Sequence, residues 1–454
     1  MPSVRVDRIT LREIRLALKE PFRISSGVVQ DRRILLLELQ DASGAIAWSE
    51  CVAGESPNYS SETIDTAWLA IAQWVAPRVL GRALAHPGEL HAVLERDFRE
   101  HRMAKAGVEM GCWGLAATLA GQPLARFIGG TRTQIATGIS LGIQASPDAL
   151  IEKVRAALAE GYRKVKIKIE PGHDVEWLTA VRRALGDDAH LMADANNAYT
   201  LDDTDRLMAL DELDLMMIEQ PLAHDDLVRH AELQRKLRTP ICLDETITSL
   251  DRAQDMITLR SGRIINIKAG RVGGFAPSLA IHDLCESQGI PVWCGGMLES
   301  GIGRAYNVAL ASLPNFTLPG DVSPSARYWA RDIVTQAWTM RDGMVSVPLD
   351  APGIGVAIDT EMIEAIDVKL KQAGAASEGQ QALLREALGR QVGAQIQNAI
   401  TKFRQQQQDL PSALVAGSAA EVEARIRAER GMKTPEQEMI AALDAQTRQG
   451  EEQT

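Results

Sequence analysis

The chain has 454 residues, a length that suits about three domains of ordinary size or one large barrel with additional segments. Its 49 Lys and Arg residues against 60 Asp and Glu residues give a net charge of −11, which argues against nucleic acid or an anionic membrane as a partner. The hydrophobic fraction of 45% and the charged fraction of 24% are ordinary, which excludes a globally disordered or fibrous chain.

Cysteine usage and the N-terminal residues indicate where the protein works. The cysteines are odd in number, widely scattered and without a C-x-x-C pair, a pattern typical of a reducing compartment. The first 20 residues interleave charged and apolar side chains and contain no signal-peptide core. No apolar stretch approaches the roughly 18 residues of a membrane helix, so we expect a cytoplasmic protein. The cysteines are Cys51, Cys112, Cys242, Cys285 and Cys294.

The first predicted elements are strands and then helices. Apolar and polar residues alternate over 4–18, and two apolar runs, 34–40 and 45–51, are joined by the turn residues Asp41 to Gly44, which predicts a β-hairpin. Helical spacing follows over 63–79 and over 106–121, where small and apolar residues predict a buried helix that stops at Gly121. We therefore expect an α+β domain over residues 1–125.

A different pattern begins near residue 134, where short apolar runs are each followed by an amphipathic helical segment. The polar ends of the second to sixth runs are 24–26 residues apart, about the length of a strand, a helix and two loops. Eight such units predict a closed (β/α)₈ barrel over residues 126–320. No G-x-G-x-x-G motif supports a dinucleotide-binding sheet. The runs are IATGIS, KVKIKIE, LMADAN, MMIEQP, ICLDET, RIINIKAG, PVWCGG and NFTLPGD.

The remaining residues divide into two segments. Residues 333–347 contain apolar runs around a turn at Asp342 and Gly343, so segment 321–367 is expected to return to the first domain and pack on it. Residues 368–454 have no counterpart in a barrel and form a predicted extension. Apolar residues recur every three to four positions between Leu384 and Phe403, which favours a docking or self-association helix over a flexible tail. We expect a homo-oligomer in which this helix assists.

Three acidic residues come near the ends of successive predicted strands: Asp194 in LMADAN, Glu219 in MMIEQP and Asp244 in ICLDET. Functional residues of such barrels lie at the carboxyl ends of strands, so these side chains are expected to converge. Three adjacent carboxylates repel one another unless a cation neutralises them. Oxygen-only ligands predict Mg²⁺, with Mn²⁺ or another divalent ion as the alternative. Unrelated helix caps are the structural alternative.

Lysines alternate with apolar residues in KVKIKIE, which places Lys164, Lys166 and Lys168 on one face of a strand. In a barrel the apolar face meets the helices, so the lysines point inward, where burial lowers the pKa of an unpaired ammonium. On an edge strand the same residues would be solvated. Lys268 ends the sixth run, across an eight-stranded ring from the second. Two lysines beside a divalent cation suit the removal of a proton from carbon next to a carboxylate.

These motifs resemble the enolase superfamily, with KIK before the three acids and NIK after them, as in the muconate lactonizing subgroup. The segments GGMLESGIGRA, at 295–305, and PGDVSPSARYW, at 319–329, resemble the branch of o-succinylbenzoate synthases and N-acylamino acid (N-succinylamino acid) racemases. The resemblance covers about residues 1–367 and implies an α/β fold, a modified TIM-like (β/α)₈ barrel with an N-terminal α+β capping domain. A helical C-terminal extension would follow it.

The resemblance also implies roles for individual residues. Asp194, Glu219 and Asp244 would bind Mg²⁺, and Lys168 and Lys268 would be the acid/base pair. Lys166, Asn196 and Arg271 would have supporting roles. The alternative for Arg271, which lies in a glycine-rich loop, is an ordinary arginine on the protein surface. The small-molecule carboxylate substrate would contact Phe22, Ser26, Tyr59, Gly296, Met297 and Glu299.

Several reactions use the same parts. The implied activity is racemisation of N-acylamino acids, joined by o-succinylbenzoate synthesis, and the first alternative is a dedicated o-succinylbenzoate synthase. Muconate cycloisomerase remains open because its lysines are arranged similarly. Dipeptide epimerases usually carry Asp-x-Asp at the eighth strand, where this chain has Asp321-Val322-Ser323. A mandelate-racemase-like histidine is not expected, since His282 lies mid-helix. A catalytically silent scaffold would not need the five charged strand-end residues.

Overall fold

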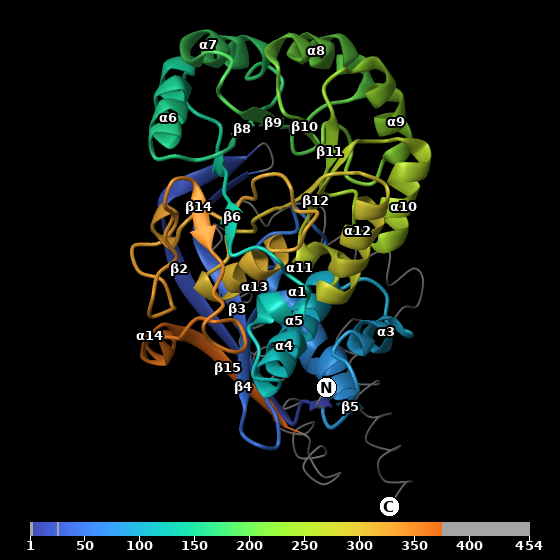
Figure 1. The fold of residues 1–454 in the computed structure, drawn as a ribbon, viewed down its shortest axis with the longest axis vertical. Helices are drawn as coiled ribbons and strands as arrows, with labels where there is room; N and C mark the ends of the chain where they lie inside the picture. The colour runs from blue at the N-terminus through green and yellow to red at the C-terminus, as the bar shows by residue number, and fades with distance from the viewer. Residues whose placement is uncertain (1–2, 25–26, 375–454) are drawn as a thin grey trace, which may run out of the picture. The chain divides into compact units, whose positions relative to one another are not determined.

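The computed structural model describes residues 3–24 and 27–374, and its first domain is built on an antiparallel sheet (Figure 1). The sheet has the order β15-β2-β3-β4, with β2 (Arg8–Ile24), β3 (Gly27–Gln40), β4 (Ile46–Cys51) and β15 (Asp367–Gly374). The predicted hairpin between β3 and β4 is confirmed. The Asp41 carboxylate accepts hydrogen bonds from the backbone N–H groups of Ser43 and Ala45, and Gly44 adopts a φ of 90° to close the turn.

Helices cover the sheet. The helix predicted over 63–79 is confirmed as α1 (Ile64–Ala70), the π-helix η1 (Ile71–Val75) and α2 (Ala76–Val79), with Thr63 as N-cap. The predicted buried helix is α4 (Arg102–Leu119), which begins earlier than expected. Its Gly107 lies so close to β3 and β4 that a Cβ atom would be 3.1–3.2 Å from Leu37 and Cys51 side-chain atoms. The domain also contains β1 (Val4–Arg5), β5 (Ala83–Leu84), α3 (Glu89–Glu95) and α5 (Leu124–Phe127).

The second domain contains seven parallel strands in the order β13-β12-β11-β10-β9-β8-β7. Helices follow the strands along the chain, and α6 to α10 form an arc around the strands in Figure 1. The strands are β7 (Ile139–Leu141), β8 (Val165–Lys168), β9 (Leu191–Asp194), β10 (Ile218–Glu219), β11 (Ile241–Leu243), β12 (Ile264–Ile267) and β13 (Val292–Cys294). The helices are α6 (Pro147–Ala159), α7 (Val175–Leu185), α8 (Thr204–Ala209), α9 (Leu227–Lys236), α10 (Leu250–Leu259), α11 (Ala269–Val272), α12 (Phe275–Ser287) and α13 (Gly301–Ala311), with 3₁₀ turns η2 (Leu201–Asp203), η3 (Leu210–Leu213) and η4 (Ser325–Arg327).

The eighth predicted run, NFTLPGD, is not a regular strand. It still joins both edges of the sheet, because the Asp321 N–H bonds to the Cys294 carbonyl and the Gly138 N–H bonds to the Gly320 carbonyl. Pro319 lacks an N–H donor, which prevents a continuous ladder here. The ring is therefore closed by isolated hydrogen bonds, and the predicted modified (β/α)₈ barrel is confirmed as the architecture.

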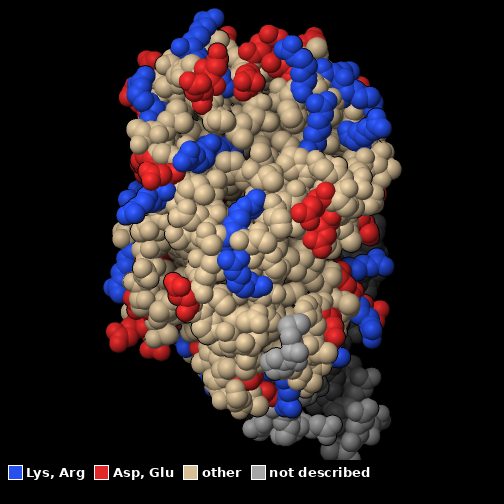
Figure 2. Space-filling model, viewed as in Figure 1, with Lys and Arg blue, Asp and Glu red and all other residues tan. Residues whose placement is uncertain are grey.

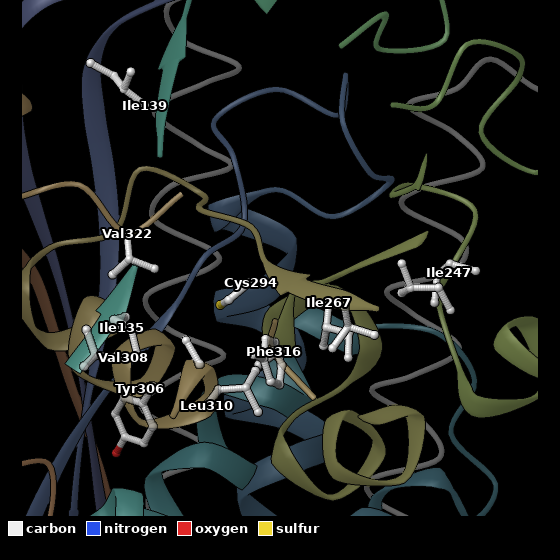
Figure 3. Packing of buried hydrophobic residues seen from close by; sticks show 14 of the residues in the cluster. Ile135, Ile139, Ile247, Ile267, Cys294, Tyr306, Val308, Leu310, Phe316 and Val322 are labelled. Atoms are coloured by element: carbon white, nitrogen blue, oxygen red, sulfur yellow. The ribbon is translucent and has the colours of Figure 1, made fainter. Parts of the chain in front are cut away.

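The interior of the barrel has an apolar layer below a charged one. Met192, Met217, Cys242, Ile264 and Trp293 form one buried cluster. On the outside of the strands, apolar side chains pack under the helices, and Figure 3 shows part of this core, including residues of β7, β12, β13 and α13. Basic and acidic residues are intermixed on the face drawn in Figure 2. Among the described residues, no helix is long and apolar enough to cross a membrane.

The segment after the barrel contacts the first domain, since the Lys19 N–H bonds to the Tyr328 carbonyl and the Leu124 N–H bonds to the Gly353 carbonyl. Its strand β14 (Met344–Ser346) pairs with β6 (Gln134–Ala136) at the start of the barrel. After α14 (Thr360–Ala365), β15 pairs antiparallel with β2 and so reaches the capping domain. Residues 368–374, the start of the predicted helical extension, are thus part of a strand. The predicted stripe between 384 and 403 lies outside the described residues.

Candidate active site

The three predicted acidic ligands lie at one edge of the parallel sheet. Asp194 and Glu219 are the last residues of β9 and β10, and Asp244 directly follows β11. The strand register pairs Glu219 with Asp194, and Asp194 with Lys168 at the end of β8. Asp194, Glu219 and Asp244 are only 0–1% exposed. Burial makes their charges costly, so each requires a positive partner.

Basic side chains supply these partners in the structure. Lys168 Nζ lies 2.6 Å from Asp194 Oδ2, and Lys268 Nζ lies 2.7 Å from Asp244 Oδ2. The Arg271 guanidinium donates to Asp244 Oδ1. Arg271 is 4% exposed, so it is not the surface arginine that the sequence alternative described.

The donor set fits a hard divalent cation, because it consists of three buried carboxylates from successive strands without His or Cys. Asp194 and Glu219 approach each other, since both lie within 3.3 Å of Lys166 Nζ, but the oxygens of all three carboxylates do not form one group in this structure. Among the described residues, a group of three with ligand atoms within 4.8 Å of one another is instead His282, Asp283 and Glu286 on α12. The ion pairs explain the difference, since Asp194 and Asp244 each face their own base.

The His282 group is structural. The His282 ring is 2% exposed, and its Nε2 accepts a hydrogen bond from the Asn315 backbone N–H. Its Nδ1 lies 2.8 Å from Asp283, which is 75% exposed. Both ring nitrogens are therefore engaged, as the mid-helix position suggested.

Lys166 neutralises several acids below the strand ends. Its Nζ lies 2.6 Å from Asp321, 3.2 Å from Glu219 and 3.3 Å from Asp194. These carboxylates outweigh the desolvation of the buried ammonium and raise the pKa of Lys166 well above its usual value. Lys164 lies 3.2 Å from Asp321 and 3.4 Å from the Trp293 ring centroid. Lys166 is thus a fixed cation rather than a base.

Sequence reasoning did not assign Asp321 a role. The available signal was its position in the eighth run, which was compared only with the Asp-x-Asp pattern of dipeptide epimerases. The structure shows that Asp321 is 6% exposed and holds Lys164 and Lys166 inside the barrel. Its pKa is lowered by these two lysines against the effect of burial.

The two candidate catalytic lysines differ in protonation preference. Burial lowers the pKa of Lys168 from its usual value, although Asp194 opposes this shift. Burial also disfavours charge on Lys268, but Tyr59, Glu219 and Glu245 outweigh it and raise the pKa of Lys268. One lysine is therefore closer to a base and the other to an acid, a division typical of acid/base sites.

Lys268 is held on several sides. Its Nζ lies 3.1 Å from the Tyr59 hydroxyl and 4.5 Å from the Tyr59 ring centroid. The same hydroxyl donates to Asp244 over 3.0 Å and accepts from Arg271 over 3.2 Å. Gly295 packs against this lysine so closely that a Cβ atom would be 2.6 Å from its Cε. Tyr59 and Arg271 therefore orient Lys268.

Asn196 positions Lys168. Its Oδ1 accepts a hydrogen bond from Lys168 Nζ over 2.6 Å, and its Nδ2 donates to Glu245 over 3.2 Å. Glu245 is 5% exposed and directly follows Asp244, yet sequence reasoning did not single it out. Its adjacency to a predicted ligand was the only signal.

The heads of Lys168 and Lys268 open into a cavity of about 420 Å³ beneath the capping domain. Four of the predicted substrate contacts line it: Phe22, Tyr59, Gly296 and Met297. Glu299 does not; it is 5% exposed and accepts a hydrogen bond from the Met297 N–H over 2.8 Å, so it supports the loop from behind. Ser26 lies outside the described residues.

Comparison with known families covers both domains. Residues 7–129 match the mandelate racemase / muconate lactonizing enzyme N-terminal domain. Residues 149–362 match the enolase C-terminal domain-like family.

Similar proteins carry two names. An o-succinylbenzoate synthase of Geobacillus kaustophilus is 48% identical over 362 residues, covering 80% of this chain and 96% of that protein. An N-succinylamino acid racemase of Thermus thermophilus is 47% identical over 363 residues, covering 80% and 97%. A solved enolase-superfamily structure from Listeria innocua has a TM-score of 0.79 at 37% identity and covers 82% of this chain and all of that chain.

Proposed function

Because the chain belongs to the enolase superfamily, we propose that it is an isomerase that racemises N-acylamino acids, N-succinylamino acids in particular, and also carries out o-succinylbenzoate synthesis in the same site. The chain is an enzyme of that superfamily whose relatives bear both names. The small-molecule substrate would be a carboxylate bound between the barrel and the capping domain.

One observation supports the proposal most strongly: Lys168 and Lys268 line the same cavity. They lie at the ends of β8 and β12, and the order β12-β11-β10-β9-β8 puts three strands between them. In a ring of eight positions such strands are opposite each other. A carbon atom held in the cavity would thus present one face to each amine, which is the geometry that inversion by two bases requires.

The residues of the chain divide the work as follows. Lys168, as neutral amine, takes the α-proton onto Nζ, and Lys268, as ammonium, donates a proton to the opposite face of the carbon; the reverse reaction exchanges the two roles. Asn196 holds the Lys168 amine, and Tyr59 and Arg271 hold that of Lys268.

The capping domain contributes much of the cavity wall above the amines, and water that it displaced on substrate binding would strengthen electrostatic interactions within the cavity. Mg²⁺, held by Asp194, Glu219 and Asp244, would supply positive charge to the substrate carboxylate as its α-proton leaves.

A dedicated o-succinylbenzoate synthase is the second candidate, since the 48% and 47% identities to the two kinds of relative do not separate them. In a dehydration Lys168 would remove the proton and assist the departure of hydroxide from the same side, while Lys268 would act only as a cation. Dipeptide epimerisation is less well supported: the hydrophobic dipeptide epimerase of Enterococcus faecalis is 28% identical, and Ser323 replaces the second Asp of the epimerase pattern.

The test is proton NMR of an N-succinylamino acid in D₂O with the enzyme and Mg²⁺. Racemisation by two bases exchanges the α-proton for deuterium while optical rotation decays, and both changes stop when EDTA removes the metal. Retained optical rotation and an unexchanged α-proton, together with turnover of the o-succinylbenzoate precursor, would select the dedicated synthase instead.

A further inference from the structure

The cavity contains a buried arginine that neither the acid/base chemistry nor the metal ligands require. Arg32 on β3 lines the same cavity as Lys168 and Lys268 and is only 5% exposed. Its Nη1 and Nη2 donate to the carbonyls of Ala53 and Val52 over 2.7 and 2.9 Å. Its buried Nε has no hydrogen-bond partner.

The charge of Arg32 is incompletely compensated. Among the described residues no carboxylate lies within 4.0 Å of its guanidinium, whereas the adjacent Arg33 pairs with both Glu13 and Asp65. Glu50 is the carboxylate that acts most strongly on Arg32, but it accepts hydrogen bonds from the N-terminus of α13 at Ser300. A buried guanidinium with unused N–H groups and no ion pair is costly unless a ligand supplies an anion.

We propose that Arg32 recognises a second carboxylate of the substrate, the one at the far end of the N-acyl group. The inference rests on the proposed function and deepens it: with the α-carboxylate on the metal side of the cavity, Arg32, which lines the cavity from the capping strand β3, would bind the other end of the molecule. The substrate class is then a dicarboxylate, an amino acid bearing an acidic acyl chain. A planar guanidinium is the side chain best suited to bind a carboxylate through two hydrogen bonds.

The purely structural role predicts something different. If Arg32 served only to hold the backbone at Val52 and Ala53, next to the loop that carries Tyr59, its loss would disturb every substrate alike. Recognition of the far carboxylate predicts a loss confined to substrates that possess it. Pairs of substrates that differ only in that group therefore separate the two roles.

The test compares an N-succinylamino acid with the corresponding N-succinamoyl compound, in which a neutral amide replaces the far carboxylate at the same size. In the wild type the succinyl compound should have the higher kcat/KM. In Arg32→Gln, which keeps a hydrogen-bond donor but loses the charge, kcat/KM for the succinyl compound should fall about 10- to 100-fold, mainly through KM. The succinamoyl compound should change less than about threefold, and Arg32→Lys should recover part of the preference.

Arg82→Gln is the matched control, since Arg82 is an exposed arginine of the capping domain that does not line the cavity; its ratio of succinyl to succinamoyl activity should equal that of the wild type. An equal loss for both substrates in Arg32→Gln, or an unchanged ratio with an unchanged melting temperature, would overturn the assignment. Failure of the proposed function is distinguishable, because the wild type would then racemise neither compound.

Discussion

Glu109 offers a pH-dependent test of the contact between the capping helix and the barrel. It lies on α4, is fully buried, and accepts hydrogen bonds from the Phe275 and Ala276 N–H groups at the start of α12 and from the Trp113 indole. Gly274 precedes that helix with a φ of 122°, and a Cβ atom there would be 2.2 Å from the Glu109 carboxylate. Glu109 therefore joins the capping domain to the segment that follows Lys268.

Burial raises the pKa of Glu109 from 4.5 to about 7, against the effect of its hydrogen bonds. The folded protein then holds this proton more tightly than the unfolded chain does. Glu109 consequently contributes most to stability below its unfolded pKa, and that contribution is lost as pH rises from about 4.5 to about 7. At roughly 1.4 kcal/mol per pH unit, the free energy of unfolding should decrease by about 3 kcal/mol over this range because of this group.

The measurement is urea unfolding of wild type and Glu109→Gln at pH 5, 6, 7 and 8. Glutamine stays neutral, so any difference in packing or hydrogen bonding adds a constant, and only the slope of the stability difference reports the ionisation. We expect the wild type to lose about 2.5 kcal/mol relative to the variant between pH 5 and pH 8, because a small part of the effect already occurs below pH 5. Glu232→Gln, which removes a half-exposed carboxylate beside Lys236, is measured in the same series as the control for loss of a surface charge. A constant difference for Glu109→Gln would refute the reasoning.

Three further outcomes follow from the site and the fold. Lys168→Ala and Lys268→Ala should each reduce racemisation by about 10²- to 10⁴-fold. Lys268→Arg should keep measurable o-succinylbenzoate synthesis if that lysine acts there only as a cation. Comparable losses of racemisation and of synthesis in Lys268→Arg would contradict these separate roles. EDTA should abolish turnover and Mg²⁺ restore it, as followed by α-proton exchange, and activity that survives exhaustive chelation would exclude the metal site. A chain ending at residue 374 should retain turnover because β15 stays intact. A chain ending at residue 366 should melt at a lower temperature, since it loses the strand paired with β2. If the chain ending at 374 lost activity while its folding and oligomeric state were unchanged, the extension would take part in the reaction.

The parts of the site that repeat along the chain could be predicted from the sequence. Regular spacing placed the acids and lysines on successive strands, and the period-two pattern of KVKIKIE placed Lys164, Lys166 and Lys168 inside the barrel, where all are less than 9% exposed. Such inferences succeed because the position of a residue along a parallel strand fixes the face of the sheet toward which its side chain points.

Other features depended on contacts between distant segments, which no local pattern encodes. Asp321 lies more than 150 residues from its partner Lys166, and the pairing of β14 with β6 joins segments of the chain that are about 210 residues apart. The eighth run differed for a local reason: it has the hydrophobicity of a strand, but Pro319 and Gly320 interrupt its ladder. Glu299 has the expected neighbours, yet its hydrogen bonds to Met297 and Asn307 direct it behind the cavity wall.

The distribution of charge between the domains suggests why chemistry and specificity are encoded differently. The barrel contributes charges in matched sets, in which Lys168 and Asp194, Lys268 and Asp244, and Lys166 and Asp321 neutralise one another. Removing one member leaves a buried charge unpaired, so these positions tolerate little change. Arg32, on the capping strand, has no such partner among the described residues. Its replacement would break no ion pair within 4.0 Å, although it would remove a positive charge that acts on the buried Glu50. The preference for an acyl group could therefore change at Arg32 without breaking the ion pairs of the lysines that handle the proton.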